Sequence, residues 1–199
     1  MKKSVLLLLL CFVSIGAYAQ YLTQQMCFLP SGNVKKVESW NASANLCAET
    51  VYFDRKGKIA KMVFPNGEYT FEWNADNTEI ECSLVNNGEV VQKDYIYVNE
   101  MDSEHYDYDI NNVNNVLKLR PNNTIASVVA TSNGQTMTNK AYYKGDNDIL
   151  PYKTVMSMGD NRQVIFYRLI STDSHDNPIR YSMSSGGTTV EIVRKITYY

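Results

Sequence analysis

Apolar and polar side chains alternate with a period of two residues along most of this chain. The clearest runs are the segments 68–73, 79–84, 163–168 and 190–198. In the first of them, Tyr69, Phe71 and Trp73 share one parity, and polar residues fill the other. Such alternation is typical of antiparallel strands that have one buried and one solvated face. No window of a dozen residues has the periodicity of an amphipathic helix, so we predict an all-β protein.

Turn signals separate these runs. Asn-Gly pairs occupy positions 66–67, 87–88 and 133–134, and this dipeptide closes tight hairpins because it accepts a positive φ at both positions. Further turns rich in Gly, Asn or Asp are expected at 32–33, 56–57, 121–123, 145–147, 159–161, 176–177 and 186–187. We predict an antiparallel meander of about 11–13 strands built from hairpin repeats, forming a curved open sheet or a partly rolled barrel. The acidic, Asn-rich segment 99–115 is predicted to be a long loop or irregular crossing.

The first nineteen residues have the pattern of a secretory signal. Lys2 and Lys3 precede an apolar stretch, and small residues at Ala17 and Ala19 mark the expected cleavage site. The apolar stretch is too short for a spanning helix, and Leu10 before Cys11 disfavours lipidation. We therefore expect residues 1–19 to be a signal peptide and residues 20–199 to form a single all-β repeat domain. The predicted location is the periplasm, the outer-membrane surface or the exterior of the cell.

Charge and motif content exclude several classes of function. A formal net charge of −2 with no basic block argues against nucleic acid as a partner. An outer-membrane barrel is disfavoured because Glu191 and Lys195 would face lipid, so we do not expect an integral membrane protein. No motif for a nucleophile elbow, a zinc protease, a P-loop or a dinucleotide site is present, so neither an enzyme nor a cofactor is predicted. The sequence does not indicate the oligomeric state.

Three cysteines follow the signal peptide, and their number is odd. A disulfide between Cys27 and Cys47 is the pair that sequence proximity favours. The alternative is that all three are small buried hydrophobic residues. Cys82 fits this alternative, because it alternates with apolar residues on one strand face.

One polar cluster could carry metal chemistry. If the segment is extended, His105, Asp107 and Asp109 face one way, and an imidazole with two carboxylates could bind a divalent ion. A solvated edge or loop, whose charges discourage pairing with another sheet, is the favoured interpretation.

Aromatic residues are the better functional candidates in a chain with 15 tyrosines and 2 tryptophans. Flat exposed rings suit sugar stacking or protein contact, although tyrosine also simply suits strands. The candidates for surface binding are Trp40, Trp73, Tyr95, Tyr97, Tyr106, Tyr108, Tyr142 and Tyr143.

Two segments resemble a known family. Phe53-Asp54-Arg55-Lys56-Gly57-Lys58-Ile59 resembles the YD-repeat pattern of aromatic-Asp-x-x-Gly-Asn-apolar. The tail, from 173 to 177 and from 193 to 199, is similar to the end of exported YD-like β-sheet proteins of Gram-negative envelopes. Lys58 replaces the usual Asn and Asp176 the usual Gly. The resemblance implies a curved antiparallel sheet used as a shell, scaffold or contact surface, and it supplies no catalytic residue.

The expected function is therefore that of a non-enzymatic envelope protein whose sheet surface binds a protein or glycan of the envelope. One alternative is a carboxylate-dependent glycan hydrolase, because the separation of two carboxylates is a tertiary property. Another is a small-ligand carrier, if the sheet closes into a barrel.

Overall fold

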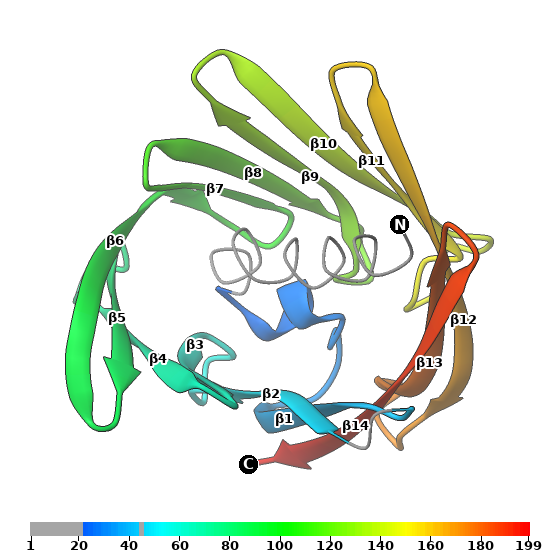
Figure 1. Cartoon of the computed structure of the whole chain (residues 1–199), viewed down its shortest axis with the longest axis horizontal. Helices are drawn as coiled ribbons and strands as arrows, with labels where there is room; N and C mark the ends of the chain where they lie inside the picture. The colour runs from blue at the N-terminus through cyan, green and yellow to red at the C-terminus, as the bar shows by residue number, and fades with distance from the viewer. Residues whose placement is uncertain (1–21, 44–45) are drawn as a thin grey trace.

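The computed structural model describes residues 22–43 and 46–199, which form a closed antiparallel barrel of fourteen strands (Figure 1). The strands are β1 Val34–Asn41, β2 Leu46–Phe53, β3 Ile59–Phe64, β4 Gly67–Trp73, β5 Glu79–Asn86, β6 Glu89–Met101, β7 His105–Ile110, β8 Val113–Leu119, β9 Ile125–Ser132, β10 Gln135–Tyr142, β11 Lys153–Met158, β12 Asn161–Thr172, β13 Pro178–Ser185 and β14 Thr188–Tyr198. Each strand pairs with its neighbour in sequence, and β14 pairs with β1. The predicted all-β meander is confirmed, with fourteen strands rather than 11–13.

The segment 99–115 is the place where the sequence prediction was wrong. It contains the end of β6, the whole of β7 and the start of β8, rather than a long loop. Tyr106 and Tyr108 point into the barrel and are buried, while Asp107 and Asp109 occupy the opposite parity. The outer parity of β7 is His105, Asp107 and Asp109, and a strand tolerates such a polar row when that face is solvated. The run of acidic residues therefore concealed a regular alternation in the sequence.

Four hairpins at one end of the barrel close with two residues of positive φ. The pairs are Asn87-Gly88, Asn111-Asn112, Asn133-Gly134 and Gly186-Gly187. The twist of such turns matches the twist of the flanking strands. We call this end the Asn-Gly rim.

At the opposite end, an Asp or Asn side chain caps several turns, and we call this end the Asx rim. Asp54 accepts hydrogen bonds from the backbone amides of Lys56 and Lys58 at 2.8 and 2.9 Å. Asp173 accepts from the amides of His175 and Asn177 at 2.9 and 3.1 Å. The same arrangement recurs at Asn74 and Asp102. The two segments that resemble YD repeats thus form the same turn.

Residues 22–33 form a plug inside the barrel, drawn in blue in Figure 1. The plug includes a short 3-10 helix, η1 (Gln24–Cys27). Gln24 anchors it: its backbone amide donates to Gly57 O at 2.9 Å, its side-chain oxygen accepts from Val34 N, and its side-chain amide donates to Gly32 O. These bonds join the plug to the Asx rim.

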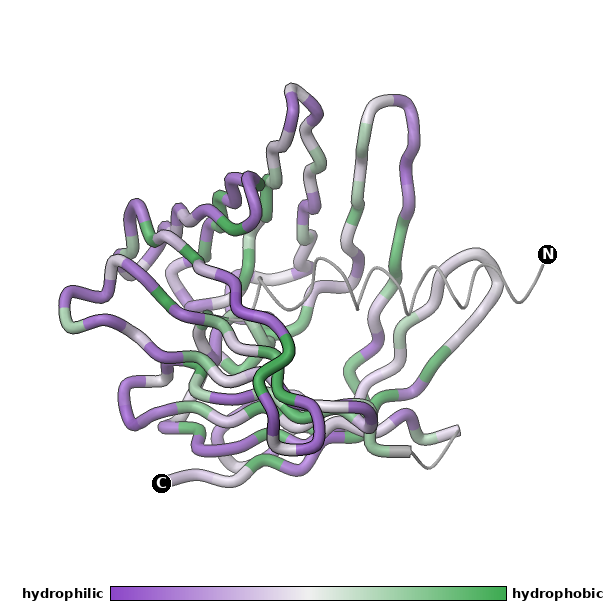
Figure 2. Tube along the Cα trace, turned by 60° about the vertical axis from the view of Figure 1, so that its left-hand side comes forward, coloured by the Kyte–Doolittle hydropathy of each residue, from purple (hydrophilic) through white to green (hydrophobic). Residues whose placement is uncertain are grey.

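The apolar core lies between the plug and the inner faces of β1–β9. Leu22, Met26 and Leu29 of the plug are fully buried. They belong to one cluster with inward residues of the sheet, among them Val37, Phe71, Ile96 and Leu117. Figure 2 shows apolar and polar residues alternating along the strands, as a barrel with one buried face requires.

Candidate functional site

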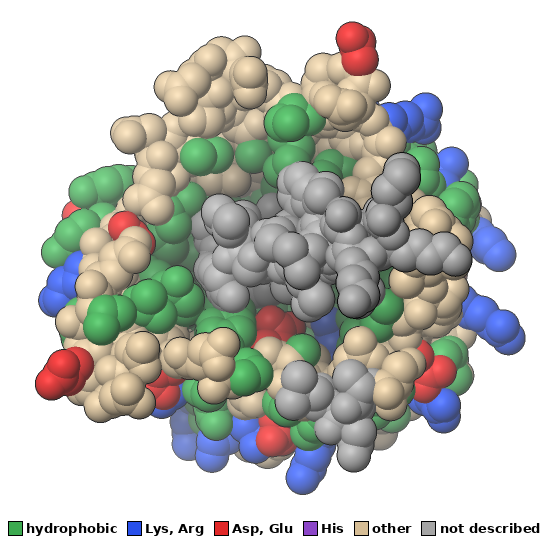
Figure 3. Space-filling model, in the orientation of Figure 1, with side chains coloured by type: hydrophobic (Ala, Val, Ile, Leu, Met, Phe, Trp, Pro, Cys, Tyr) green, Lys and Arg blue, Asp and Glu red, His purple; other side chains and the backbone are tan. Residues whose placement is uncertain are grey.

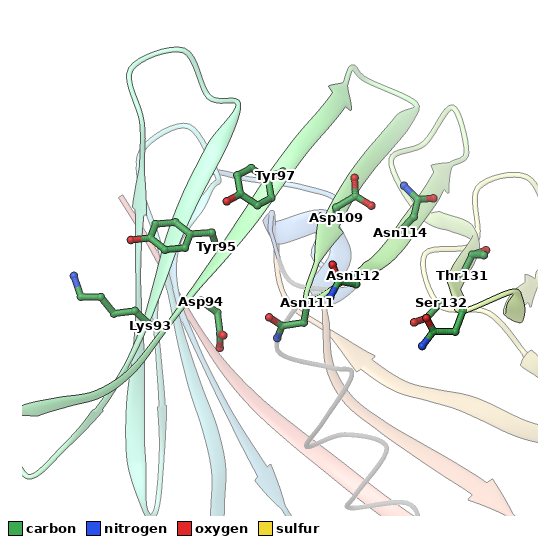
Figure 4. A pocket seen from close by; sticks show the side chains of 11 residues that line it. Lys93, Asp94, Tyr95, Tyr97, Asp109, Asn111, Asn112, Asn114, Thr131 and Ser132 are labelled. Carbon is green, nitrogen blue, oxygen red and sulfur yellow. The ribbon is translucent and has the colours of Figure 1, made fainter.

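A groove of about 700 Å³ crosses the outer face of β6–β9 near the Asn-Gly rim. Its floor is a row of four side chains on four neighbouring strands. The sheet register places Tyr97 opposite Asp109, Asp109 opposite Asn114, and Asn114 opposite Thr131. Figure 4 shows this row from close by.

Two tyrosines of β6 lie at one end of the groove, with Tyr97 in the floor and Tyr95 beside it. Tyr95 and Tyr97 are two residues apart, so they project from the same face of the strand, and they are 40% and 50% exposed. The hydroxyl of Tyr95 donates to Glu81 on β5 at 3.3 Å, which restrains that ring. Both were predicted as surface aromatics, and the structure brings them together at one cavity.

Amide groups hold the Asp109 carboxylate of the floor and the neighbouring Asp107 carboxylate of the same strand. Asn99 donates from its side-chain amide to Asp109 at 2.7 Å and to Asp107 at 3.0 Å. Asn114 also donates to Asp107, at 2.8 Å. The carboxylate oxygens therefore have fixed positions while keeping further acceptor capacity for a ligand hydroxyl.

Two hairpin tips complete the groove. Asn111 and Asn112 close the β7–β8 hairpin, and Ser132 and Asn133 stand where β9 turns into β10. Sequence reasoning missed these residues as a site because they were assigned to a loop or to turns. An Asn-Asn pair read as a two-residue hairpin at 111–112 would have placed Asp109 opposite Asn114.

Tyr106 and Tyr108 are not surface aromatics. Both lie inside the barrel, at 7% and 0% exposure, because they share the inward parity of β7. Burial raises the pKa of both phenols. These two rings belong to the core and cannot reach a partner outside it.

The remaining aromatic candidates are scattered. Trp73 packs against the core, and its indole N–H donates to Ile59 O at 3.0 Å. Trp40 is half-buried on β1. Tyr143 donates to Ile125 O, whereas Tyr142 is exposed on β10, with the Lys153 ammonium 4.7 Å from its ring centroid.

The candidate metal ligands do share one face of β7, as the period of a strand predicts. However, the His105 ring nitrogen lies 3.1 Å from a Glu100 carboxylate oxygen, and the two aspartates are bound to amides. In residues 22–43 and 46–199, no group of three His, Cys, Asp or Glu side chains is arranged to hold a metal ion.

Cys27, Cys47 and Cys82 are free thiols in the structure. Cys27 is buried in the plug, and Cys47 Sγ lies 3.8 Å from the hydroxyl of Thr50. Burial raises the pKa of Cys82 to about 12 and raises that of Cys27 further. The Cys27–Cys47 disulfide stays a prediction.

Comparisons with known proteins add little. No family model and no curated protein matches the chain. Among solved structures, a porin-like protein from Bacteroides vulgatus ATCC 8482 is similar, with 13% identity, a TM-score of 0.49, and coverage of 83% of this chain and 98% of that one. A similarity at this level says nothing about what this chain does. Among the described residues, no helix has the length and apolar character needed to cross a bilayer.

Proposed function

We propose that this chain is an exported, non-enzymatic envelope protein whose outer groove binds a neutral glycan. The observation that carries the proposal is the pair of exposed rings, Tyr95 and Tyr97, beside a floor of carboxylate, amide and hydroxyl groups. Ring faces cover the apolar C–H face of a sugar, and planar side chains with two polar atoms match neighbouring hydroxyls.

The charge of the groove favours a neutral ligand. Its lining includes one cation, Lys93, and two carboxylates, Asp94 and Asp109, while most other members are Asn, Ser or Thr. Lys93 is already in an ion pair with Glu81 at 2.5 Å. A highly charged polymer would find little net attraction here.

The arrangement of the carboxylates supports binding rather than hydrolysis. A glycosidase places two carboxyl groups across the scissile bond from each other. Asp107 and Asp109 instead project from the same face of one strand and share the amide of Asn99. They can hold hydroxyls, but they do not face each other across a cleft.

The charges on the outer face of the sheet favour a barrel whose wall faces water rather than the hydrocarbon core of a bilayer. Ion pairs lie along this face, including Lys36–Glu38 at 2.9 Å and Arg180–Glu191 at 2.7 Å. A charge facing lipid would cost up to about 2–4 kcal/mol at the bilayer midplane. The inner parity is the apolar one, and the plug covers much of it.

A glycan array followed by calorimetry tests the proposal. We expect the protein to bind neutral oligosaccharides, and Tyr95→Ala or Tyr97→Ala to weaken binding about two- to tenfold, because a stacked ring contributes on the order of 0.5–1.5 kcal/mol. Tyr142→Ala is the matched control, because Tyr142 is 38% exposed but lies outside the groove. Silence on the array, or equal losses in all three variants, would refute the proposal.

A small-ligand carrier is the second candidate, and barrel closure is the observation that favours it. Met137, Met156 and Met183 on β10, β11 and β13 are half-buried and lie outside the core cluster, so they are apolar side chains that a small ligand could contact. An apolar fluorescent probe displaced by fatty acids would support a carrier. A probe that stays dark with the natively folded protein would exclude it.

We also propose that the chain is a degenerate member of the YD-like hairpin-repeat proteins. The shared capping by Asp54 and Asp173 supports this, because both turns use an Asp that accepts from two backbone amides. Sequences of relatives would test it: Asp or Asn should recur at both positions.

A further inference from the structure

Charge is divided between two sides of the barrel. Strands β4–β7 carry nine Asp or Glu residues and a single Lys. Strands β10–β13 carry five Lys or Arg residues and no Asp or Glu. Strands β4–β6 lie on the opposite side of the molecule from β12 and β13 (Figure 1), and Lys and Arg side chains line the edge beside β12 and β13 in Figure 3.

The cationic side also presents apolar residues. On the outer face, the register places Tyr142 opposite Lys153 and Lys153 opposite Phe166. Phe166 is 52% exposed. We call the outward residues of this side the basic wall: Lys140, Tyr142, Lys153, Arg162, Phe166 and Arg168.

The four cations of the basic wall form no ion pair with other described residues of the protein. The nearest strand carboxylate in the ladder, Glu191, is paired with Arg180 at 2.7 Å. Asp160 stands in the β11–β12 turn, and Asp146 and Asp148 stand in the β10–β11 loop, so all three lie at the rims rather than on the wall.

We propose that the basic wall docks on the surface of an anionic lipid bilayer. A barrel wall is convex, so its partner must be an extended surface rather than a small enclosed ligand. A hydrophilic polyanion would leave Phe166 and Tyr142 in water. The interface of an anionic bilayer accepts both groups, because aromatic rings settle at headgroup depth and cations lie near phosphates.

Docking in this way orients the molecule. The acidic strands β4–β7 are repelled by the same surface, so they face away from it. The groove spans β6–β9 and therefore opens toward the solvent, clear of the membrane. The docking itself does not depend on which ligand the groove takes.

Vesicle co-sedimentation tests the proposal. We expect the purified protein to sediment with vesicles of phosphatidylglycerol mixed with phosphatidylcholine, but not with phosphatidylcholine alone. Added salt should release it, because exposed charges are screened. The double variant K153Q/R168Q should lower the partition coefficient about 25-fold, at about fivefold per cation, and F166S should lower it further.

The matched control removes two cations that lie outside the basic wall. K35Q/K118Q changes exposed residues of β1 and β8 that form no ion pair with other described residues, so it should leave sedimentation within about twofold of the parent. An unchanged melting temperature should show that every variant folds. Equal sedimentation with both vesicle types, or no effect of K153Q/R168Q, would overturn the proposal.

Sedimentation velocity without lipid is a second experiment. A dimer that K153Q/R168Q abolishes would assign the basic wall to a second copy of the chain instead, and would also overturn the proposal.

Discussion

The hydroxyl of Tyr198, the last residue of β14, donates a hydrogen bond to the carboxylate of Asp173 in the turn between β12 and β13. The same hydroxyl accepts from the side-chain amide of Asn177, which also donates to Ser31 O in the plug at 2.7 Å. The Tyr198 ring stacks on His175 with centroids 4.1 Å apart. One residue thus joins the closing strand, the Asx rim and the plug.

Tyr198→Phe should therefore lower the free energy of unfolding by about 1.5–3 kcal/mol, the usual contribution of a hydrogen bond to a charged group. Tyr199→Phe is the matched control, because its hydroxyl donates to the neutral carbonyl of Phe53 and should contribute only about 1 kcal/mol. Urea unfolding measures both. Equal losses would contradict the special role of Tyr198.

Tyr108→Phe should not destabilise the protein and should raise the free energy of unfolding by about 1 kcal/mol. The Tyr108 hydroxyl is buried and has no hydrogen-bond partner among residues 22–43 and 46–199, so its removal ends a desolvation cost. By contrast, Tyr143→Phe loses a 2.7 Å bond to Ile125 O and should destabilise. A loss of stability in Tyr108→Phe would show that its hydroxyl is bonded in solution.

Glu49 should make stability depend on pH. It lies opposite inward-facing Ser39, and burial raises its pKa above the ordinary value of 4.5, while Arg194 partly opposes that shift. Because the folded pKa is the higher one, the stability that protonated Glu49 contributes is complete below pH 4.5 and is lost as the pH rises through the folded value.

Glu49→Gln removes this titration. The difference in unfolding free energy between Glu49→Gln and the parent should therefore shift in favour of the variant as the pH increases from about 4 to 8. Urea titrations across that range measure it. A difference that stays constant with pH would contradict a raised pKa at Glu49.

Two glycines provide a matched pair for backbone strain. Gly57 and Gly88 both have a positive φ, 76° and 84°. An added Cβ at Gly57 would lie 3.3 Å from the Gln24 side chain, whereas at Gly88 it would meet nothing within 4 Å. Gly88→Ala should cost about 1–2 kcal/mol for the left-handed conformation alone, and Gly57→Ala should cost more because it disturbs the plug. Thermal unfolding compares them, and the reverse order would contradict the anchoring role of Gln24.

Local patterns predicted most of this fold. The alternation around Phe71 and the Asn-Gly pairs at 87–88 and 133–134 correspond to real strands and turns, because both signals depend only on neighbouring residues. Barrel closure could not be read in this way. It depends on the pairing of Val37 with Ile196, which lie nearly a whole chain apart in sequence. It also depends on the plug, whose apolar residues pack against the inner face of the sheet.

The groove was predictable only in part. Exposed tyrosines at 95 and 97 follow from the parity of β6, but their polar neighbours come from three other strands. These residues come together only through the register of the strands, which the Asn111-Asn112 turn sets. The acidic, Asn-rich composition of the segment led us to predict a loop there instead of a turn. The burial of Tyr108 was not predicted because the same segment was taken for a loop.

The two ends of the barrel differ in how much change they tolerate. At the Asn-Gly rim, Gly134, Gly159 and Gly186 have open space where a side chain would project. The polypeptide can therefore be cut, rejoined as a circular permutant or lengthened by an inserted peptide at these tips without touching the plug. At the Asx rim, the β2–β3 and β12–β13 turns offer no such freedom, since Gly57 O and the Asn177 side chain are hydrogen-bonded to the plug. An inserted domain is therefore better accommodated at the Asn-Gly rim than at the turns that hold the plug.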